Sequence, residues 1–224
     1  MSQLIKSAVV IGATGLVGRE LLKQLNQNPT CERIVAIVRR EDEQLKKFEK
    51  FEKVEQLVMD DFLLINDQDV NGFSHAFSCL GSTIKKAGSK ANFYTIDFEI
   101  NAHFADLFSE TDTHFVLVSA HGADAGSMFF YNQVKGELEQ YLKKSSLALI
   151  SILRPSLLLG ERNESRTLED VSQKLFKRLS HLVPDTFKYK PVTAEQVAHT
   201  MVEVAQTQTE KFKIYDNLHI QKSK

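Results

Sequence analysis

The chain has 224 residues, of which 42% are hydrophobic and 25% are charged, and its formal net charge at pH 7 is −1. This composition is typical of a folded globular protein, and the balanced charge argues against nucleic-acid binding as the main function. The two cysteines lie outside any Cys-x-x-Cys or Cys/His cluster, which predicts a reducing compartment, no structural disulfide and no bound metal.

The first predicted element is a buried strand that runs into a glycine turn and a helix, within residues 7–22. Gly12 permits a sharp turn, Gly15 lets the backbone approach a pyrophosphate, and Gly18 lets the helix pack closely on the sheet. The N–H groups at the helix start favour phosphate. On its own, this spacing also fits an ordinary turn and helix start. The candidate cofactor contacts here are Gly12, Thr14, Gly15, Leu16, Val17 and Gly18.

A second apolar strand, residues 33–38, ends at Arg39 and Arg40, about twenty residues beyond Gly18. Proteins that bind NAD usually carry an acidic residue near this place to hold the ribose hydroxyls. Arginine can instead bind a 2′-phosphate, so we expect NADP, as NADPH, rather than NAD. The other interpretation is a solvated basic patch that Glu41 and Asp42 partly neutralise.

Strands and helices then alternate along the chain. Helical stretches are expected at 41–53, 96–108 and 129–144, and strands at 54–59, 75–80, 114–118 and 147–153. Apolar strands that alternate with helices predict a parallel sheet covered on both faces. The predicted fold class is therefore α/β: a Rossmann-type doubly wound parallel sheet in a single domain over residues 1–224. Asp60 and Asp61, at the end of the third strand, are expected either to contact the adenine or to cap a turn.

The tail beyond Pro155 is expected to add elements on the substrate side, mainly within residues 155–210. It combines a charged loop at 161–166, a helix at 168–182, a helix at 193–206 and a short edge strand at 212–215. Thr193 and Gln196 form a capping-box pattern, which supports the start of the second of these helices.

The residues that best fit catalysis are Ser119, Tyr131 and Lys135. Tyr131 and Lys135 lie four apart on the helix after the fifth strand, so they share a helix face, and Ser119 ends that strand. A phenol has a pKa near 10, and a lysine cation close by lowers it. Tyr131 could give a proton to a carbonyl oxygen while nicotinamide gives hydride to its carbon, with Ser119 hydrogen-bonded to the same oxygen.

Other interpretations of these residues were weighed. A Tyr-x-x-x-Lys pattern can arise by chance, but its place on a sheet with a dinucleotide turn favours the catalytic interpretation. His121 near Ser119 suggests a hydrolase, yet no Gly-x-Ser-x-Gly elbow is present. The loop lysines Lys85, Lys86 and Lys90 fit a solvated loop better than a contact with an anionic ligand.

With these residues in view, the chain resembles the atypical branch of the short-chain dehydrogenase/reductase superfamily, and within it the Tat-interacting-protein oxidoreductase family. The resemblance rests on GATGLVG, YNQVK and residues 78–89, 118–139 and 152–166, and it covers nearly the whole chain. It implies an NADPH-binding fold with Ser119, Tyr131 and Lys135 in the catalytic positions. It also implies an ordering role for Asn101, and nicotinamide-side contacts from Leu80, Gly81, Lys135, Pro155 and Leu157.

The function expected is an NADP-dependent reductase of a small carbonyl compound, with Tyr131 as general acid and base. The alternative is a non-catalytic NADPH-binding regulator or redox sensor that acts through a protein partner. The first strand starts almost at once and the apolar run at 147–160 is too short for a bilayer, so we expect a cytoplasmic protein without a membrane partner. We expect a monomer or dimer, and the sequence does not identify the substrate or a protein partner.

Overall fold

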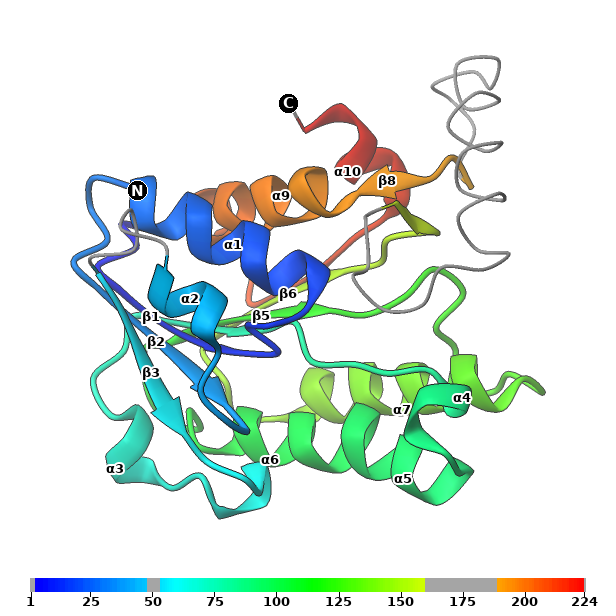
Figure 1. The fold of residues 1–224 in the computed structure, drawn as a ribbon. Coiled ribbons are helices and arrows are strands. Elements are labelled where there is room, and N and C mark those ends of the chain that lie inside the picture. Colours follow the sequence, from blue (N-terminus) through cyan, green and yellow to red (C-terminus); the bar gives the residue numbers. More distant parts are fainter. Residues whose placement is uncertain (1–2, 48–52, 160–188, 224) are drawn as a thin grey trace.

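A parallel sheet of seven strands runs through the computed structural model, which describes residues 3–47, 53–159 and 189–223 (Figure 1). The strand order is β3-β2-β1-β4-β5-β6-β9, and every neighbouring pair is parallel. The strands are β1 (Ser7–Ile11), β2 (Arg33–Val38), β3 (Val54–Val58), β4 (His75–Ser78), β5 (His114–Val118), β6 (Leu149–Leu153) and β9 (Phe212–Tyr215). The predicted doubly wound α/β fold in a single domain is confirmed.

Helices cover both faces of the sheet, because successive strand residues point to opposite faces and most are apolar. One layer contains α1 (Leu16–Gln27), α2 (Glu43–Lys47), α9 (Ala194–Thr207) and α10 (Asn217–Lys222). The other contains α3 (Asp67–Val70), α5 (Lys90–Tyr94), α6 (Ile100–Asp106) and α7 (Phe130–Lys144), with the 3₁₀ turn η1 (Phe62–Leu64). Figure 1 shows α1 and α9 side by side above the sheet, and α6 and α7 below it.

Several predicted elements agree closely with the structure. The strands at 33–38, 114–118 and 212–215 have the predicted bounds, and α9 begins after the expected Thr193 capping box. The lysine-bearing segment expected as a loop instead forms α4 (Ile84–Ala87) and the start of α5, each capped by a side-chain oxygen of Thr83 or Ser89. Helices α3 and α10 and the small pair β7 (Leu158–Leu159) with β8 (Val192–Thr193) were not predicted from the sequence.

The helix expected at 96–108 starts earlier and contains an irregular turn. It begins at Lys90 as α5, passes through the π-helical turn η2 (Thr95–Glu99), and continues as α6. A π turn contains more residues than an α turn, so residues four apart across it do not share a face as they do in an α-helix. This turn therefore sets which side chains point toward the carboxyl ends of the strands.

The described part of the tail adds α9 to the helical layer that contains α1, and α9 packs along α1. The predicted charged loop at 161–166 and the helix at 168–182 lie outside the described residues. Within the described ranges 3–47, 53–159 and 189–223, no helix is both long and apolar enough to cross a membrane.

Two buried histidines lie at the amino ends of neighbouring strands, His75 on β4 and His114 on β5. Both ring systems lie 3.1–3.3 Å from the carbonyl oxygen of Ala205 near the end of α9, and His114 Nε2 lies 2.8 Å from Ser151 Oγ. Burial lowers the pKa of His75 to about 4, and burial with repulsion from His75 lowers that of His114 to about 3. Both imidazoles are therefore neutral at pH 7.

Candidate active site

The glycine turn between β1 and α1 packs directly against the backbone that follows β4. Gly12 has φ +72°, and a Cβ there would lie 2.4 Å from both the Cys79 carbonyl carbon and the Leu80 nitrogen. A Cβ at Gly18 would lie 2.3 Å from the Gly12 oxygen. A side chain at either position would therefore displace backbone. At Gly15 the nearest atom to such a Cβ is the Gly12 oxygen at 3.3 Å, so the turn is less crowded there.

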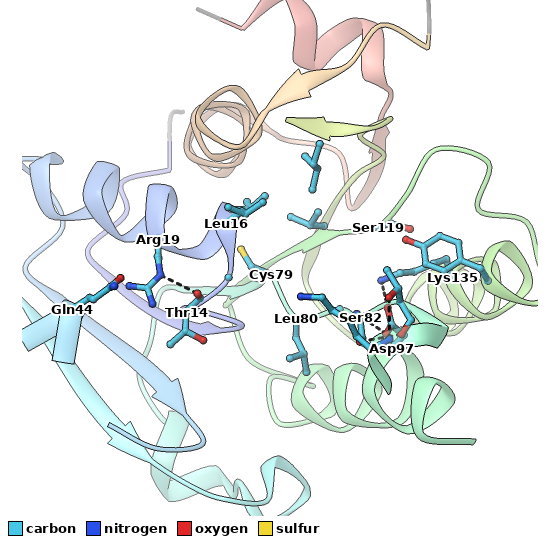
Figure 2. Close-up of a pocket in the computed structure, with 18 residues that line it drawn as sticks. Thr14, Leu16, Arg19, Gln44, Cys79, Leu80, Ser82, Asp97, Ser119 and Lys135 are labelled. Carbon is cyan, nitrogen blue, oxygen red and sulfur yellow. Dashed lines mark hydrogen bonds and ion pairs between the residues drawn. The ribbon is translucent and has the colours of Figure 1, made fainter. Parts of the chain in front are cut away.

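A cleft of about 490 Å³, here called the main cleft, lies at the carboxyl ends of β1, β4 and β5. Figure 2 shows Thr14 and Arg19 on one side of it, Ser119 and Lys135 on the other, and Cys79 and Leu80 between them. Of the predicted site residues, it is lined by Thr14, Gly15, Leu16, Val17, Leu80, Gly81, Ser119, Tyr131 and Lys135. Its other lining residues include Arg19, Gln44, Cys79, Ser82, Thr83, Lys86, Asp97 and Leu158.

Lys135 is buried in the wall of the main cleft and is paired with an acid that the sequence analysis did not single out. Its Nζ lies 2.7 Å from Oδ1 of Asp97, a residue of η2. Burial acts to lower the pKa of Lys135, but the Asp97 carboxylate, with smaller contributions from Tyr131 and Glu139, holds the pKa above its ordinary value. The Lys135 side chain is therefore a charged ammonium at neutral pH, one helical turn from Tyr131.

Ser119 hydrogen-bonds away from the reacting position that we expected for it. Its Oγ donates to Oε1 of buried Glu139 at 2.5 Å. Glu139 in turn accepts hydrogen bonds from the Arg154 guanidinium, at 3.0 and 3.1 Å from Nε and also from Nη2. A serine hydroxyl has one proton, so while this bond lasts Ser119 can only accept a hydrogen bond in the cleft. The expectation that Ser119 donates to a carbonyl oxygen is not supported by this geometry.

A second, smaller hollow of about 300 Å³, the side pocket, shares Thr14 and Leu80 with the main cleft. Of the residues predicted to contact a cofactor, Gly12, Arg39 and Arg40 also line it. Its acidic residues are Glu41 and Asp42.

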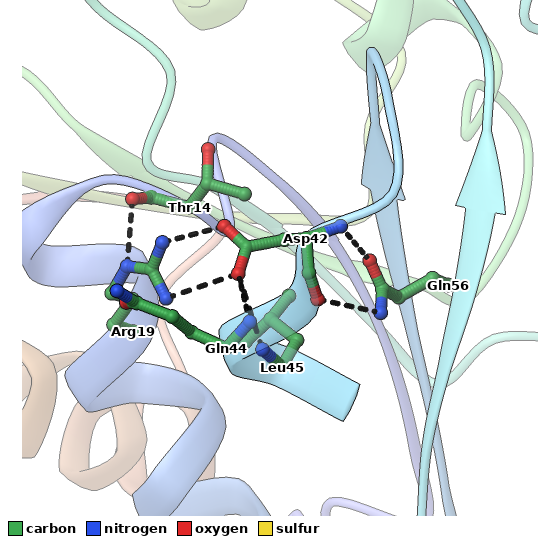
Figure 3. Close-up of polar contacts among 6 residues, drawn as sticks. All are labelled: Thr14, Arg19, Asp42, Gln44, Leu45 and Gln56. Carbon is green, nitrogen blue, oxygen red and sulfur yellow. Dashed lines mark hydrogen bonds and ion pairs between the residues drawn. The ribbon is translucent and has the colours of Figure 1, made fainter. Parts of the chain in front are cut away.

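Both acids of the side pocket are bonded to other groups. Glu41 pairs with Lys46. Figure 3 shows the Asp42 carboxylate held by the Arg19 guanidinium and by the backbone N–H groups of Gln44 and Leu45, at 2.5–3.5 Å. Partial burial acts to raise the pKa of Asp42, but the hydrogen bonds from Arg19 and the backbone hold it below its ordinary value.

Five predicted residues line neither hollow. Gly18 packs on the glycine turn, as expected, and Pro155 is buried with its carbonyl bonded to the His121 N–H at 2.8 Å. Leu157 is exposed, and Leu158 lines the main cleft instead. Asp60 is exposed and accepts a local hydrogen bond from the Asp61 N–H at 3.0 Å. The carboxylate of Asp61 caps η1, which agrees with the turn-capping alternative.

Asn101 is also outside both hollows. It is fully buried, accepts a hydrogen bond from Ser78 Oγ, and donates from Nδ2 to the Ile96 carbonyl at 3.0 Å. Its amide thus ties the π turn to the end of β4. Asp97, four residues earlier, occupies the position on the cleft that we expected Asn101 to take.

The functional residues missed in the sequence are Asp97, Glu139 and Arg154, together with Arg19. No spacing rule pairs Asp97 with Lys135 or Arg154 with Glu139. Asp97 and Glu139 lie within helical segments, about twenty residues beyond the ends of β4 and β5, so their positions in the sequence do not indicate that they reach this edge of the sheet.

Comparison with known proteins agrees with this architecture. The family model described as semialdehyde dehydrogenase, NAD binding domain, matches residues 7–125. The protein FMP52-1, mitochondrial, of Scheffersomyces stipitis is 36% identical over 207 residues, covering 92% of this chain and 90% of that protein. The protein HTATIP2 of Rattus norvegicus is 34% identical over 177 residues, covering 78% of this chain and 72% of that protein.

Solved structures with low sequence identity share the fold. A putative NAD-dependent epimerase/dehydratase from Bacillus halodurans superposes with a TM-score of 0.64 at 22% identity, covering 89% of this chain and 87% of that one. A UDP-glucuronic acid 4-epimerase from Bacillus cereus, solved in complex with NAD, gives 0.67 at 14% identity, covering 94% and 77%. At this identity the likeness shows the Rossmann-type fold alone.

The comparisons correct one expectation. The FMP52 proteins of Scheffersomyces stipitis, Debaryomyces hansenii and Candida albicans, 33–36% identical to this chain, are all named mitochondrial. The prediction of a cytoplasmic protein is therefore contradicted. It rested on the early start of the first strand and on the short apolar run at 147–160, and neither property distinguishes the cytosol from an organelle.

Proposed function

Since this chain belongs to the NAD(P)-binding Rossmann family that includes the FMP52 and HTATIP2 proteins, we propose that it is an NADP-dependent oxidoreductase that reduces a small carbonyl compound. The observation that carries this proposal is the composition of the main cleft. It joins the glycine turn after β1 to Ser119, Tyr131 and Lys135, which come from the end of β5 and from α7.

The residues present fit a dinucleotide. The glycine turn has no room for side chains at Gly12 and Gly18, and Gly15 is the N-cap of α1, so no side chain caps the first N–H groups of this helix. Those N–H groups and the positive end of the helix dipole suit a pyrophosphate. Thr14 and Leu80, shared by the two hollows, would lie along the middle of the cofactor, with Arg39 and Arg40 toward its adenosine end.

In the reaction that we propose, bound NADPH supplies the hydride that goes to the carbonyl carbon. Tyr131 gives its hydroxyl proton to the carbonyl oxygen, and the Lys135 ammonium stabilises the phenolate that remains. Ser119, whose hydroxyl donates its hydrogen bond to Glu139, accepts a hydrogen bond from the hydroxyl of the alcohol product. Leu16 and Leu158 add apolar side chains to the lining of the main cleft.

The preference for NADP over NAD follows from the charges in the side pocket. An acid that binds ribose hydroxyls favours NAD, yet Glu41 and Asp42 are both bonded to cations of the protein. Arg39 and Arg40 remain as the groups that can form charge-assisted hydrogen bonds to a 2′-phosphate.

Thermal unfolding with each cofactor tests the binding step. A ligand at one hundred times its dissociation constant adds about 2.7 kcal/mol to the free energy of unfolding, so we expect NADPH to raise the melting temperature clearly and NADH to raise it less. Equal or larger stabilisation by NADH would contradict the role given to the arginines. No stabilisation by either cofactor would contradict the proposal as a whole.

Oxidation of NADPH, followed at 340 nm against a panel of small aldehydes, ketones and quinones, tests the catalytic step. We expect turnover with members of the panel. NADPH binding without any turnover across the panel would instead support the alternative of a cofactor-binding regulator.

A further inference from the structure

The most deeply buried ion pair among the described residues lies directly behind the proposed proton donor. Asp97 is fully buried, the Lys135 side chain is 4% exposed, and their charged atoms are 2.7 Å apart. Taking two charges out of water is costly unless they are paired with good geometry. The pair therefore constrains both the position and the protonation state of Lys135.

The local backbone aims Asp97 at this position. Asp97 lies in the middle of η2, the single π-helical turn between α5 and α6. Such turns interrupt α-helices and occur frequently at functional sites. The Asn101 side chain bonds to the Ile96 carbonyl within this turn, and so holds it in place from the side away from the cleft.

The segment after β4 closes over the pair from the other side. The Ser82 N–H donates to Asp97 Oδ2 at 2.8 Å. A Cβ at Gly81 would lie 3.2 Å from Asp97 Oδ1 and 3.3 Å from Lys135 Nζ, which is tighter than ordinary contact. Gly81 thus lets the backbone pack against the pair while Ser82 orients the carboxylate.

We propose that Asp97 is a positioning residue for the reductase chemistry: it holds Lys135 as a charged ammonium, in place beside Tyr131. This inference rests on the proposed function for its catalytic meaning. A buried amine without a counter-charge readily loses its proton, and a neutral amine does not stabilise the phenolate that forms when Tyr131 gives up its proton. In this role Asp97 acts through Lys135.

The ionisation of Tyr131 gives a direct readout that requires no substrate. The chain contains five tyrosines and no tryptophan, so tyrosinate absorbance near 295 nm is not obscured by indole. The titration is recorded on the full chain without cofactor, over the pH range in which far-UV circular dichroism is constant. Subtracting the curve of the matching Tyr131→Phe protein isolates the Tyr131 signal.

The informative variant is Asp97→Asn, which keeps the shape of the side chain and removes its charge. We expect the Tyr131 tyrosinate signal to appear about one pH unit or more above its position in the unmodified protein, because Lys135 has lost its proton and no longer favours the phenolate. The matched control is Glu99→Gln, which removes an exposed carboxylate from the same turn and should leave the signal in place. An unchanged signal in folded Asp97→Asn protein would overturn the proposal.

A second variant covers the case in which Asp97→Asn does not fold. Gly81→Ala keeps every charge and crowds the pair, so we expect a smaller shift in the same direction, and no shift would count against the proposal. The pH profile of turnover adds a further check, since activity of Asp97→Asn should fall off at lower pH than in the unmodified protein. A shifted tyrosinate signal in a protein that turns over no carbonyl compound would support the positioning role and contradict the proposed function.

Discussion

At the carboxyl ends of β4, β5 and β6 this protein holds pairs of charged side chains, whereas at the amino ends of β4 and β5 it buries neutral imidazoles. Here the upper edge of the sheet means the edge formed by the carboxyl ends of its strands, and the lower edge means the edge formed by their amino ends. The group at the upper edge comprises Asp97 with Lys135, and Glu139 with Arg154, and all four residues line surface hollows. The lower pair, His75 and His114, lines none of the described hollows.

The difference suits the two edges of the sheet to different roles: groups that a ligand can reach lie at one edge, and groups that stabilise the fold lie at the other. Charged pairs at the upper edge hold hydroxyl and ammonium groups where a ligand can reach them. At the lower edge, two rings and a helix carbonyl satisfy each other's hydrogen bonds without any charge, and join β4 and β5 to α9. Substitutions at the upper edge should therefore change activity more than stability, and the reverse should hold below.

The largest expected effect is at the upper edge, in Tyr131→Phe. Removing the proton donor should lower turnover about 10³-fold, since general acid catalysis contributes about 10²- to 10⁴-fold. NADPH binding and the melting temperature should change little, because the ring remains. Tyr141→Phe, on the same helix but bonded to Asp106 away from the cleft, is the matched control. Turnover that persists in Tyr131→Phe would contradict the proposed mechanism.

The next effect is at the lower edge and depends on pH. The folded protein keeps His75 and His114 neutral, with pKa values of about 4 and about 3, while the unfolded chain protonates them near 6.5. The unfolded state therefore binds more protons between these values, and the free energy of unfolding falls as pH drops from 6.5 toward 3. We expect a loss of a few kcal/mol between pH 7 and pH 5, measured by urea denaturation.

Two variants sharpen this test. In the double variant His75→Gln with His114→Gln, the fall in the free energy of unfolding between pH 7 and pH 5 that is due to these rings should disappear. This expectation holds whatever the free energy of unfolding of the variant at pH 7. His103→Gln, at a helix position that bonds to the Ile65 carbonyl, should keep the full dependence. A free energy of unfolding that is as large at pH 5 as at pH 7 would contradict the role of the buried pair.

A third effect compares the two ends of β2. Replacing Arg39 and Arg40 together by alanine should weaken NADPH binding about tenfold or more, equal to about 1.4 kcal/mol, and leave NADH binding unchanged. Arg33→Ala, at the opposite end of the strand, removes an exposed arginine that pairs with Glu55 and should alter neither affinity. Fluorescence titration of each reduced cofactor measures both. Equal weakening of NADPH and NADH would point to a general electrostatic effect rather than to the 2′-phosphate.

The smallest effect concerns α9, which contacts β8 at one end and supplies the Ala205 carbonyl at the other. Thr193→Ala removes the side chain that accepts from the Gln196 N–H, and should lower the free energy of unfolding by about 1 kcal/mol. Thr193→Ser keeps the oxygen and should retain most of the stability. Equal urea midpoints for Thr193→Ala and the unmodified protein would show that tertiary packing alone holds the helix end.

The sequence predicted the sheet well because its strands are short apolar runs with clear ends, as at residues 33–38 and 114–118. It also predicted the main cleft, since the carboxyl ends of parallel strands meet at one edge. Asp97 could not be found in this way, because the π turn changes the angular offset between Asp97 and Asn101 and no pattern announces it. The sequence also could not predict where the Ser119 hydroxyl points, because its hydrogen-bond acceptor is Glu139, twenty residues away in the chain.

The contact between the glycine turn and the backbone after β4 has a consequence for folding during synthesis. Gly12 rests on the backbone of Cys79 and Leu80, and the Cys79 N–H donates to the Ile11 carbonyl at 3.0 Å. During synthesis, the first strand and its turn leave the ribosome long before these residues do. The nucleotide cradle is thus completed only when β4 docks, so a nascent chain that ends within α2 has the whole glycine motif and lacks the surface that shapes it.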